Sequence, residues 1–535
     1  MIARKSLIIT ASQFFARFIG LIGLVLLAKL WGGFAADALG IIGFALSFLA
    51  LFSFLADMGF NKTHVKRISE GKDLGTCLGT YATIKLILIS IMVAAIIIAI
   101  FIWKNVLHRQ FYDATTESVI YVFILYYMFL NLHQIATVTF EGTREIGKME
   151  TAKSFENLVK VPLMLLIALA GVLIIGKKTI APMIPWPDIF QPVQQFLALH
   201  ALGALAMTYV LGVVAVFLIG FYFLRRYPWK KPTRPMLNVY LLFAFPLMFT
   251  GIMSIVSANI DKIMIGYFWT SKEVGYYFGV QQFSQSITII PAAVSTILFP
   301  TMSQYFISKD FQKIHSVLLS AQRYISLILV PVVVVILVFA HPMINIFLNS
   351  AFLPATSVLL LYAIIALFSA LSMPYSSLLT AMNRPDISAK IGFVTCIITI
   401  SLSFLFIPKN GLLSPFGING ITGAAVATFI SSIIGFVGLL LTVKKIASIS
   451  FLQRHIPLHI FSGIIIAGIL YGLNTIIPVV RWYELLGVSF IALAIYLLIL
   501  FILREFTKED LMFFLNLVYP RETLRYLKSE LIKQK

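Results

Sequence analysis

A charged side chain interrupts the first apolar stretch of the chain. Arg17 lies within ASQFFARFIGLIGLVLLAKL, residues 11–30. On a helix it shares one face with other small or polar residues spaced three and four apart, namely Ser6, Thr10, Gln13 and Gly20. A guanidinium near the middle of a membrane costs about 2.5–3.5 kcal/mol on insertion scales. We therefore expect Arg17 to face a hydrated cavity, where it could hold an anionic group with Gln13 and Thr10 beside it.

Two later apolar stretches also carry polar faces. Within 237–267 the residues on or near such a face are Thr250, Ser254, Ser257, Asn259, Asp261 and Lys262, and within 274–304 they are Gln281, Gln285, Thr288 and Ser295. Hydroxyl and amide groups can bind sugar hydroxyls, and an ammonium can bind an anion. We expect Lys262 to support Arg17 at an anionic headgroup, while the neighbouring polar side chains contact sugar hydroxyls.

Each of these features has a simpler interpretation. Arg17 could extend to the membrane interface or form an ion pair with Glu141 or Asp57. Asp261 and Lys262 could form an ordinary ion pair with each other. The serine and glutamine faces could make hydrogen bonds between packed helices.

The composition is that of an integral membrane protein. Of the 535 residues, 60% are hydrophobic and 12% charged, and the mean hydropathy is +0.97. Apolar runs long enough to cross a bilayer recur along the chain. About fourteen spans are predicted, near 7–32, 38–58, 80–103, 118–141, 155–176, 199–224, 237–267, 274–304, 323–348, 353–381, 389–407, 418–443, 457–478 and 483–503.

Basic residues in the loops give an orientation for these spans. The net charge is +20, and most Lys and Arg fall in loops that share a side with both termini. The opposite side holds few of them, which are Lys104, Arg109, Lys177, Lys178, Lys272, Lys409 and Arg481. By the positive-inside rule, both termini are expected in the cytoplasm and the protein in the plasma membrane. The charges are spread over short loops, so we expect no nucleic-acid partner.

Enzyme chemistry has little support in the sequence. Cys77 and Cys396 match no metal-ligand spacing. The longest outer loop, 177–198, contains only Asp188 as an acid, whereas a membrane glycosyltransferase would need acidic metal ligands there. No paired carboxylates, nucleophile triad or phosphate-binding glycine loop is found. We therefore expect no enzyme activity, no metal and no cofactor.

Weak internal similarity divides the chain into two halves. LGIIG at 39–43 corresponds to VGYYFG at 274–279, and two further pairs follow in the same order, around Arg144 and Arg384 and around Gly203 and Gly423. The predicted fold is an all-α polytopic membrane protein with two six-helix lobes around a central cavity, 1–234 and 235–455. The prediction also includes two additional helices at 456–503 and a cytoplasmic amphipathic tail at 504–535. A capping motif in this tail starts at Thr507.

Four segments resemble the oligosaccharide-lipid flippases and polysaccharide exporters of the multidrug/oligosaccharidyl-lipid/polysaccharide (MOP) superfamily. They are DMGFNKTHVKRISEG (57–71), NIDKIMIGYFWTSKEVGYYFGVQQF (259–283), LLTAMNRPDISAK (378–390) and GINGITGAAVATFISS (417–432). The resemblance implies alternating access of a central cavity to the two membrane faces. It also implies that a polyprenyl or dolichyl (di)phosphate-linked oligosaccharide is carried to the outer leaflet, with Arg17 at the phosphate. We expect membrane lipids as further partners, and a monomer.

A cation-coupled multidrug or metabolite exporter of the same superfamily is the alternative function. Such an exporter would be expected to carry an acid on an early cavity helix, whereas the first span holds Arg17 and no carboxylate. The glycan, the lipid carrier and the driving force stay open at this level. Asp57, Glu141 and Asp261 are the candidate sites for a coupling cation.

Overall fold

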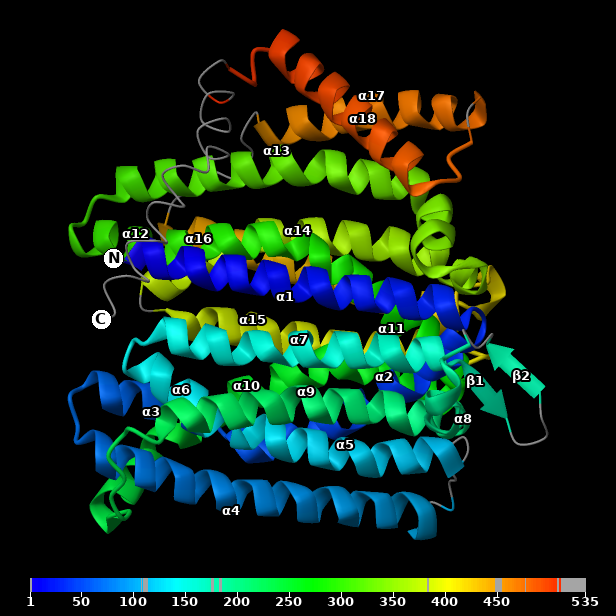
Figure 1. The fold of residues 1–535 in the computed structure, drawn as a ribbon. Coiled ribbons are helices and arrows are strands. Elements are labelled where there is room, and N and C mark those ends of the chain that lie inside the picture. Colours follow the sequence, from blue (N-terminus) through cyan, green and yellow to red (C-terminus); the bar gives the residue numbers. More distant parts are fainter. Residues whose placement is uncertain are drawn as a thin grey trace.

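The protein is a bundle of long helices that run side by side (Figure 1). The computed structural model describes residues 2–106, 108, 114–174, 178–181, 185–382, 384–447, 455–476, 478–507 and 510. Outside that description are the side chains of residues 2–11, 114, 174, 178–181, 245–247, 249–250, 289–290, 292–293, 295–297, 299–300 and 447, which include Thr250 and Ser295. Eleven helical segments of the described chain are long and apolar enough to cross a membrane. Large apolar side chains such as Ile98, Leu218 and Leu498 are exposed on the bundle. The protein is therefore a multi-pass membrane protein.

The predicted spans of the first half agree with the helices found there. The elements are α1 (Ile2–Trp31), α2 (Phe34–Asp57), α3 (Phe60–Ser69), α4 (Leu74–Phe101), α5 (Ala114–Leu132), α6 (Gln134–Gly142), α7 (Ile146–Ala170), α8 (Gln191–Leu199) and α9 (Ala201–Leu224). An all-α chain is confirmed with one small exception. In the loop after α7, β1 (Val172–Ile174) and β2 (Lys178–Ala181) form an antiparallel pair.

The second half and the two additional helices also match. The elements are α10 (Arg234–Phe268), α11 (Ser271–Gln285), α12 (Ile289–Ile307), α13 (Phe311–Met343), α14 (Thr356–Ala381), α15 (Pro385–Phe406), α16 (Gly420–Ala447), α17 (His455–Ile476) and α18 (Trp482–Ile502). The predicted span 274–304 is interrupted by a 3-10 turn at Ser286–Thr288. Pro331 leaves α13 helical, and the non-helical backbone lies at Phe339, three residues before Pro342.

Two glycines bring the halves of the chain into close contact. A Cβ atom at Gly275 of α11 would lie 1.8 Å from the carbonyl oxygen of Ala36 on α2, and one at Gly40 would lie 1.7 Å from that of Ser271. Only hydrogen fits at either position. Gly40 and Gly275 are the residues that mark the internal similarity between the halves, so equivalent positions of the two halves face each other here.

Polar contacts close the same end of the bundle, where α1 ends. The side-chain nitrogen of Asn349 donates to the carbonyl oxygens of Ala28 (2.6 Å) and Gly32 (2.9 Å). The ammonium of Lys29 donates to the carbonyl oxygen of Asn345 at 2.7 Å. These bonds tie α1 to the turn after α13, which belongs to the second half. The two halves are therefore joined at this end by backbone packing and by hydrogen bonds.

At the other end, Arg323 of α13 binds the segment that follows α18. Its guanidinium donates to the Asp510 carboxylate at 2.7 and 2.9 Å and to the Glu505 carboxylate at 2.9 Å. Burial opposes ionisation of Asp510, but the bonds from Arg323 and Thr507 outweigh it and hold the pKa of that carboxyl below its usual range. Thr507 and Asp510 also bond each other reciprocally, as the capping motif predicts. The tail beyond Asp510 is outside the described residues, and the domain boundaries stay predictions.

Candidate functional site

Arg17 lies at a pocket between helices of the bundle, and its side chain is exposed there. The pocket has a volume of about 360 Å³, and α1, α2, α5, α7, α9 and α11 contribute its walls. Its polar lining residues are Arg17, Tyr126, Asn157, Lys160, Tyr209, Gln282, Gln285 and Ser286. Of the predicted polar face of α1, Arg17 and Gly20 line this pocket, and α11, the first part of the predicted eighth span, closes it from the other half of the chain.

The Arg17 guanidinium is available to an anion. It donates one hydrogen bond, at 3.2 Å, to the backbone carbonyl oxygen of Gln285. Among the described residues, no carboxylate lies within 4.0 Å of its nitrogens. Arg17 therefore forms no ion pair with Asp57 or Glu141. Asp57 instead accepts from the backbone nitrogen of Asn61. A guanidinium with donors to spare suits a phosphate.

Two residues of α7 extend the positive side of this pocket. The Lys160 ammonium lies 5.0 Å from the Tyr209 ring centre and 3.8 Å from the Glu156 carboxylate. The Asn157 amide nitrogen donates to the carbonyl oxygen of Ala16 at 2.7 Å, and its buried oxygen has no hydrogen-bond partner among the described groups. The sequence assigns neither residue to the site. Its one signal was that Lys160 is a charged residue inside an apolar span.

An apolar groove adjoins the Arg17 pocket. It has a volume of about 740 Å³ and runs between α13 and α18. Leu21 and Ser286 line both spaces. Leucine, isoleucine, valine and phenylalanine side chains make up most of the groove wall. A polar, positively charged pocket therefore opens beside a long apolar surface, an arrangement that fits an amphiphile with an anionic head.

Asp261 lies in a separate buried hydrogen-bond network. Its carboxylate accepts from the hydroxyls of Tyr277 (2.8 Å), Thr428 (2.9 Å) and Ser403 (3.1 Å), which come from α11, α16 and α15. The Tyr277 hydroxyl also contacts that of Tyr362 on α14 at 2.7 Å. Three hydroxyl donors balance the buried carboxylate, and the network connects five helices of the second half, α10, α11, α14, α15 and α16.

Lys262 belongs to the same region and not to the Arg17 pocket. It is 4% exposed, and its ammonium donates to the Ala258 carbonyl oxygen (2.7 Å) and to the Gln281 side-chain oxygen (2.9 Å). Asp261 and Lys262 thus use other partners and make no direct ion pair. Of the predicted site, the structure brings Arg17 and Gln285 together in one place and Asp261, Lys262 and Gln281 in another.

The remaining predicted residues have different surroundings. Gln13 is exposed on α1, about one turn before Arg17, and Thr10 lies in α1 with its side chain outside the described atoms. The Asn259 amide donates to a carbonyl of its own helix, that of Ile255. Ser254 and Ser257 line a space of about 720 Å³ between α10 and α15.

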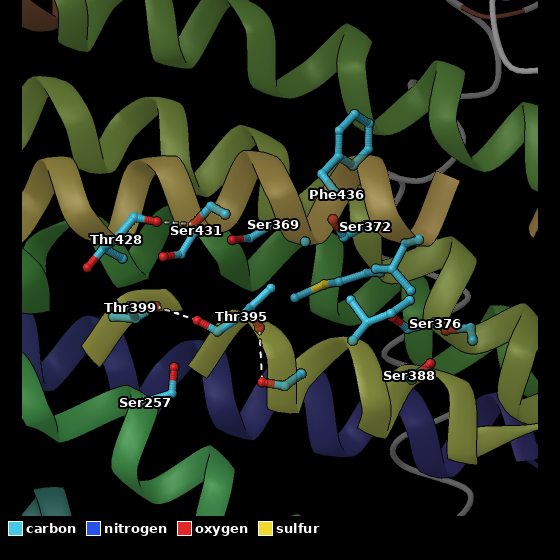
Figure 2. A pocket seen from close by; sticks show the side chains of 17 residues that line it. Ser257, Ser369, Ser372, Ser376, Ser388, Thr395, Thr399, Thr428, Ser431 and Phe436 are labelled. Carbon is cyan, nitrogen blue, oxygen red and sulfur yellow. Dashed lines mark hydrogen bonds between the residues drawn. The ribbon is translucent and has the colours of Figure 1, made fainter. Parts of the chain in front are cut away.

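Ser257 also borders a neighbouring pocket of about 610 Å³ among α10, α14, α15 and α16 (Figure 2). Hydroxyl side chains from all four helices point toward this space. The sequence singled out only Ser257 among them. Among the described residues, no group of three or more His, Cys, Asp or Glu side chains is placed to hold a metal ion.

Comparisons with known proteins agree with this architecture. Residues 192–357 match the family described as Polysaccharide biosynthesis protein. The probable low-salt glycan biosynthesis flippase Agl15 of Haloferax volcanii is 22% identical over 92% of this chain and 94% of its own. The probable flippase AglR of that organism is 24% identical over 33% of this chain and 36% of its own.

Solved structures show the same fold at low sequence identity. The lipid II flippase MurJ, in an inward closed conformation, superposes with a TM-score of 0.67 at 15% identity, over 91% of this chain and 97% of that one. An inward-facing multidrug resistance MATE family transporter of the MOP superfamily gives 0.61 at 13% identity, over 82% and 100%. The chain thus has the same fold as these two transporters, and its predicted resemblance to oligosaccharide-lipid flippases and polysaccharide exporters is confirmed.

Proposed function

We propose that the protein is a flippase that moves a lipid-linked oligosaccharide from the cytoplasmic to the outer leaflet by alternating access. The observation that carries this proposal is the Arg17 guanidinium, unpaired with any described carboxylate, in a pocket that adjoins an apolar groove. A sugar phosphate cannot cross hydrocarbon unaided, because each unsatisfied polar group costs several kcal/mol. The lipid chain can stay in an apolar environment throughout. Binding and orientation of the cargo are the whole task, so no catalytic group is required.

The alternative is a cation-coupled exporter of drugs or metabolites. The superfamily fold is compatible with both functions, so the lining of the pocket must decide. The residues that line the Arg17 pocket include two cations, Arg17 and Lys160, and no carboxylate. Glu156 lies 3.8 Å from Lys160, so Arg17 is the lining cation without a described carboxylate partner. A cationic drug would be repelled by this lining, whereas the phosphate of a lipid carrier would be attracted to it.

Reconstitution tests the function directly. Purified protein in liposomes is expected to transfer a fluorescent polyprenyl diphosphate oligosaccharide between leaflets, measured as the fraction of label accessible to a membrane-impermeant quencher. Liposomes without protein serve as the control for spontaneous exchange. Transport of cationic dyes without transfer of the lipid-linked sugar would contradict the flippase and favour the exporter.

We propose that the protein acts in the plasma membrane as a monomer with both termini in the cytoplasm. The loop charges support this orientation. In this orientation, Asp188 and Lys231 lie on opposite sides of the membrane. The cysteine of Asp188→Cys should react with an impermeant maleimide on intact cells. The cysteine of Lys231→Cys should react only after permeabilisation. Cys77 and Cys396 are buried and should not react. Labelling of both new cysteines from one side would contradict the orientation.

A further inference from the structure

Of the 17 residues that line the pocket of Figure 2, 11 carry a hydroxyl group, and Met373, Ile391 and Leu439 are among the apolar ones. The residues with a hydroxyl group are Ser257 on α10, Ser369, Ser372, Ser376 and Ser377 on α14, Ser388, Thr395 and Thr399 on α15, and Thr428, Ser431 and Ser432 on α16. No Lys, Arg, Asp or Glu is among the residues that line it. The volume of about 610 Å³ is within the range of small-molecule sites in proteins. This space is distinct in composition from the positively charged Arg17 pocket.

The hydroxyl protons are largely used within the helices. Ser372 donates to the Phe368 carbonyl oxygen at 2.8 Å, Thr395 to that of Gly392 at 3.0 Å, and Ser431 to that of Ala427 at 2.8 Å. A hydroxyl that donates in this way keeps its oxygen lone pairs for an incoming donor. The walls therefore present acceptors, which match a ligand with many O–H donors.

One aromatic ring is among the residues that line this space. Phe436 of α16 lines the pocket, and its position is fixed by Phe368 and Tyr375, whose ring centres lie 5.4 and 6.4 Å away. A sugar ring has C–H groups on its faces and hydroxyls at its edge, so it can rest on an aromatic face while its hydroxyls reach polar neighbours. Hydroxyl acceptors with one flat ring and no charge are complementary to an uncharged sugar.

Helix packing alone does not account for this set of hydroxyls. Serine and threonine commonly occur where membrane helices approach closely, because they are small. In that case the helices would fill the space between them, whereas here an open volume separates the four hydroxyl-bearing faces. Lining hydroxyls bond to carbonyl oxygens of their own helices, as those of Ser372 and Ser431 do, and the described side chains leave the space between the four faces unfilled.

We propose that this hydroxyl pocket binds uncharged sugar rings of the cargo while Arg17 binds its phosphate. This assignment rests on the proposed flippase function. One helix contacts both regions: Thr428 borders the hydroxyl pocket and donates to Asp261, which also accepts from Tyr277 on α11. The far end of α11 contributes Gln285 to the Arg17 pocket. The cargo glycan would thus contact the second half of the chain and the phosphate the first.

Binding of matched lipids to the purified full-length protein tests the assignment. One probe is a polyprenyl phosphate that carries a neutral hexose disaccharide, and the second is the same polyprenyl phosphate without sugar. Thr395→Val and Ser372→Ala remove one acceptor each. Each is expected to weaken binding of the sugar-bearing probe roughly fivefold and to leave the sugar-free probe unchanged. Thr442→Val, which removes a similarly bonded hydroxyl of α16 away from the pocket, is the control.

The outcomes separate the two proposals. If both probes bind the wild type and the pocket variants change neither, the sugar assignment is wrong while the flippase can stand. If neither probe binds the wild type, the proposed function itself fails. A probe with a uronate in place of the hexose should bind less tightly than the hexose probe, since no cation lines the pocket. Equal affinity would contradict the assignment to uncharged sugars.

Discussion

Arg17→Ala is expected to lower flippase activity about 10- to 100-fold, since one charge-assisted hydrogen bond is worth about 1.5–3 kcal/mol and the guanidinium can form two to a phosphate. The loss should appear as weaker binding of the sugar-free polyprenyl phosphate as well as slower transfer between leaflets. The guanidinium has one described hydrogen bond, to the Gln285 carbonyl oxygen, so its removal should leave the fold intact. The checks are transfer in liposomes, lipid binding and the melting temperature.

Two further variants show what Arg17 contributes. Arg17→Lys keeps the charge and loses the fork of donors, so partial activity would indicate that charge suffices, and near-complete loss that bidentate contact is needed. Arg225→Ala is the control, because Arg225 lies outside the pocket, over the Tyr222 ring. Wild-type transport by Arg17→Ala would exclude Arg17 from the cargo site and leave the proposed function without its main support.

The positions of the spans and the polar face of α1 could be read from the sequence. Apolar runs and their polar interruptions are local properties, and a face at spacings of three and four follows from helix geometry alone. Arg17 therefore stood out as a charge that needed water or a partner. The helices that surround Arg17 could not be predicted in this way. Asn157 and Lys160, which line the same pocket, come from α7, and only tertiary packing brings them near Arg17.

The same limit explains the placement of Lys262. Its position on a polar face predicts that Lys262 is buried, and it is buried in the structure. The sequence does not predict which cavity that face borders. Rotation and depth of α10 place Lys262 beside Gln281, in the network of Asp261. The hydroxyl pocket was harder still to foresee, since four helices contribute to it and serine in a membrane helix is usually a packing residue.

Gly275→Ala is expected to shift the protein toward the state that is open at the end where α1 terminates. The new Cβ would lie 1.8 Å from the Ala36 carbonyl oxygen, a backbone atom that cannot move without displacing α2. Overpacking of this kind costs about 1–3 kcal/mol, which changes a conformational equilibrium roughly 5- to 150-fold. The state in which α2 and α11 separate does not bear this cost, so its population rises and transport slows.

Spin labels at Leu199→Cys and Leu412→Cys can measure this shift. Both residues are exposed, at 52% and 67%, and Leu199 ends α8 whereas Leu412 follows α15 in the other half of the chain. Gly275→Ala should increase the fraction of long distances between the labels, whereas Gly203→Ala should not, because nothing lies within 4 Å of a Cβ at Gly203. An unchanged distance distribution with normal transport would mean that contact between Gly40 and Gly275 does not hold this end closed. A shift with slowed transport would show that the contact between Gly40 and Gly275 holds the two halves closed. It would also explain why both halves have glycine at this equivalent position.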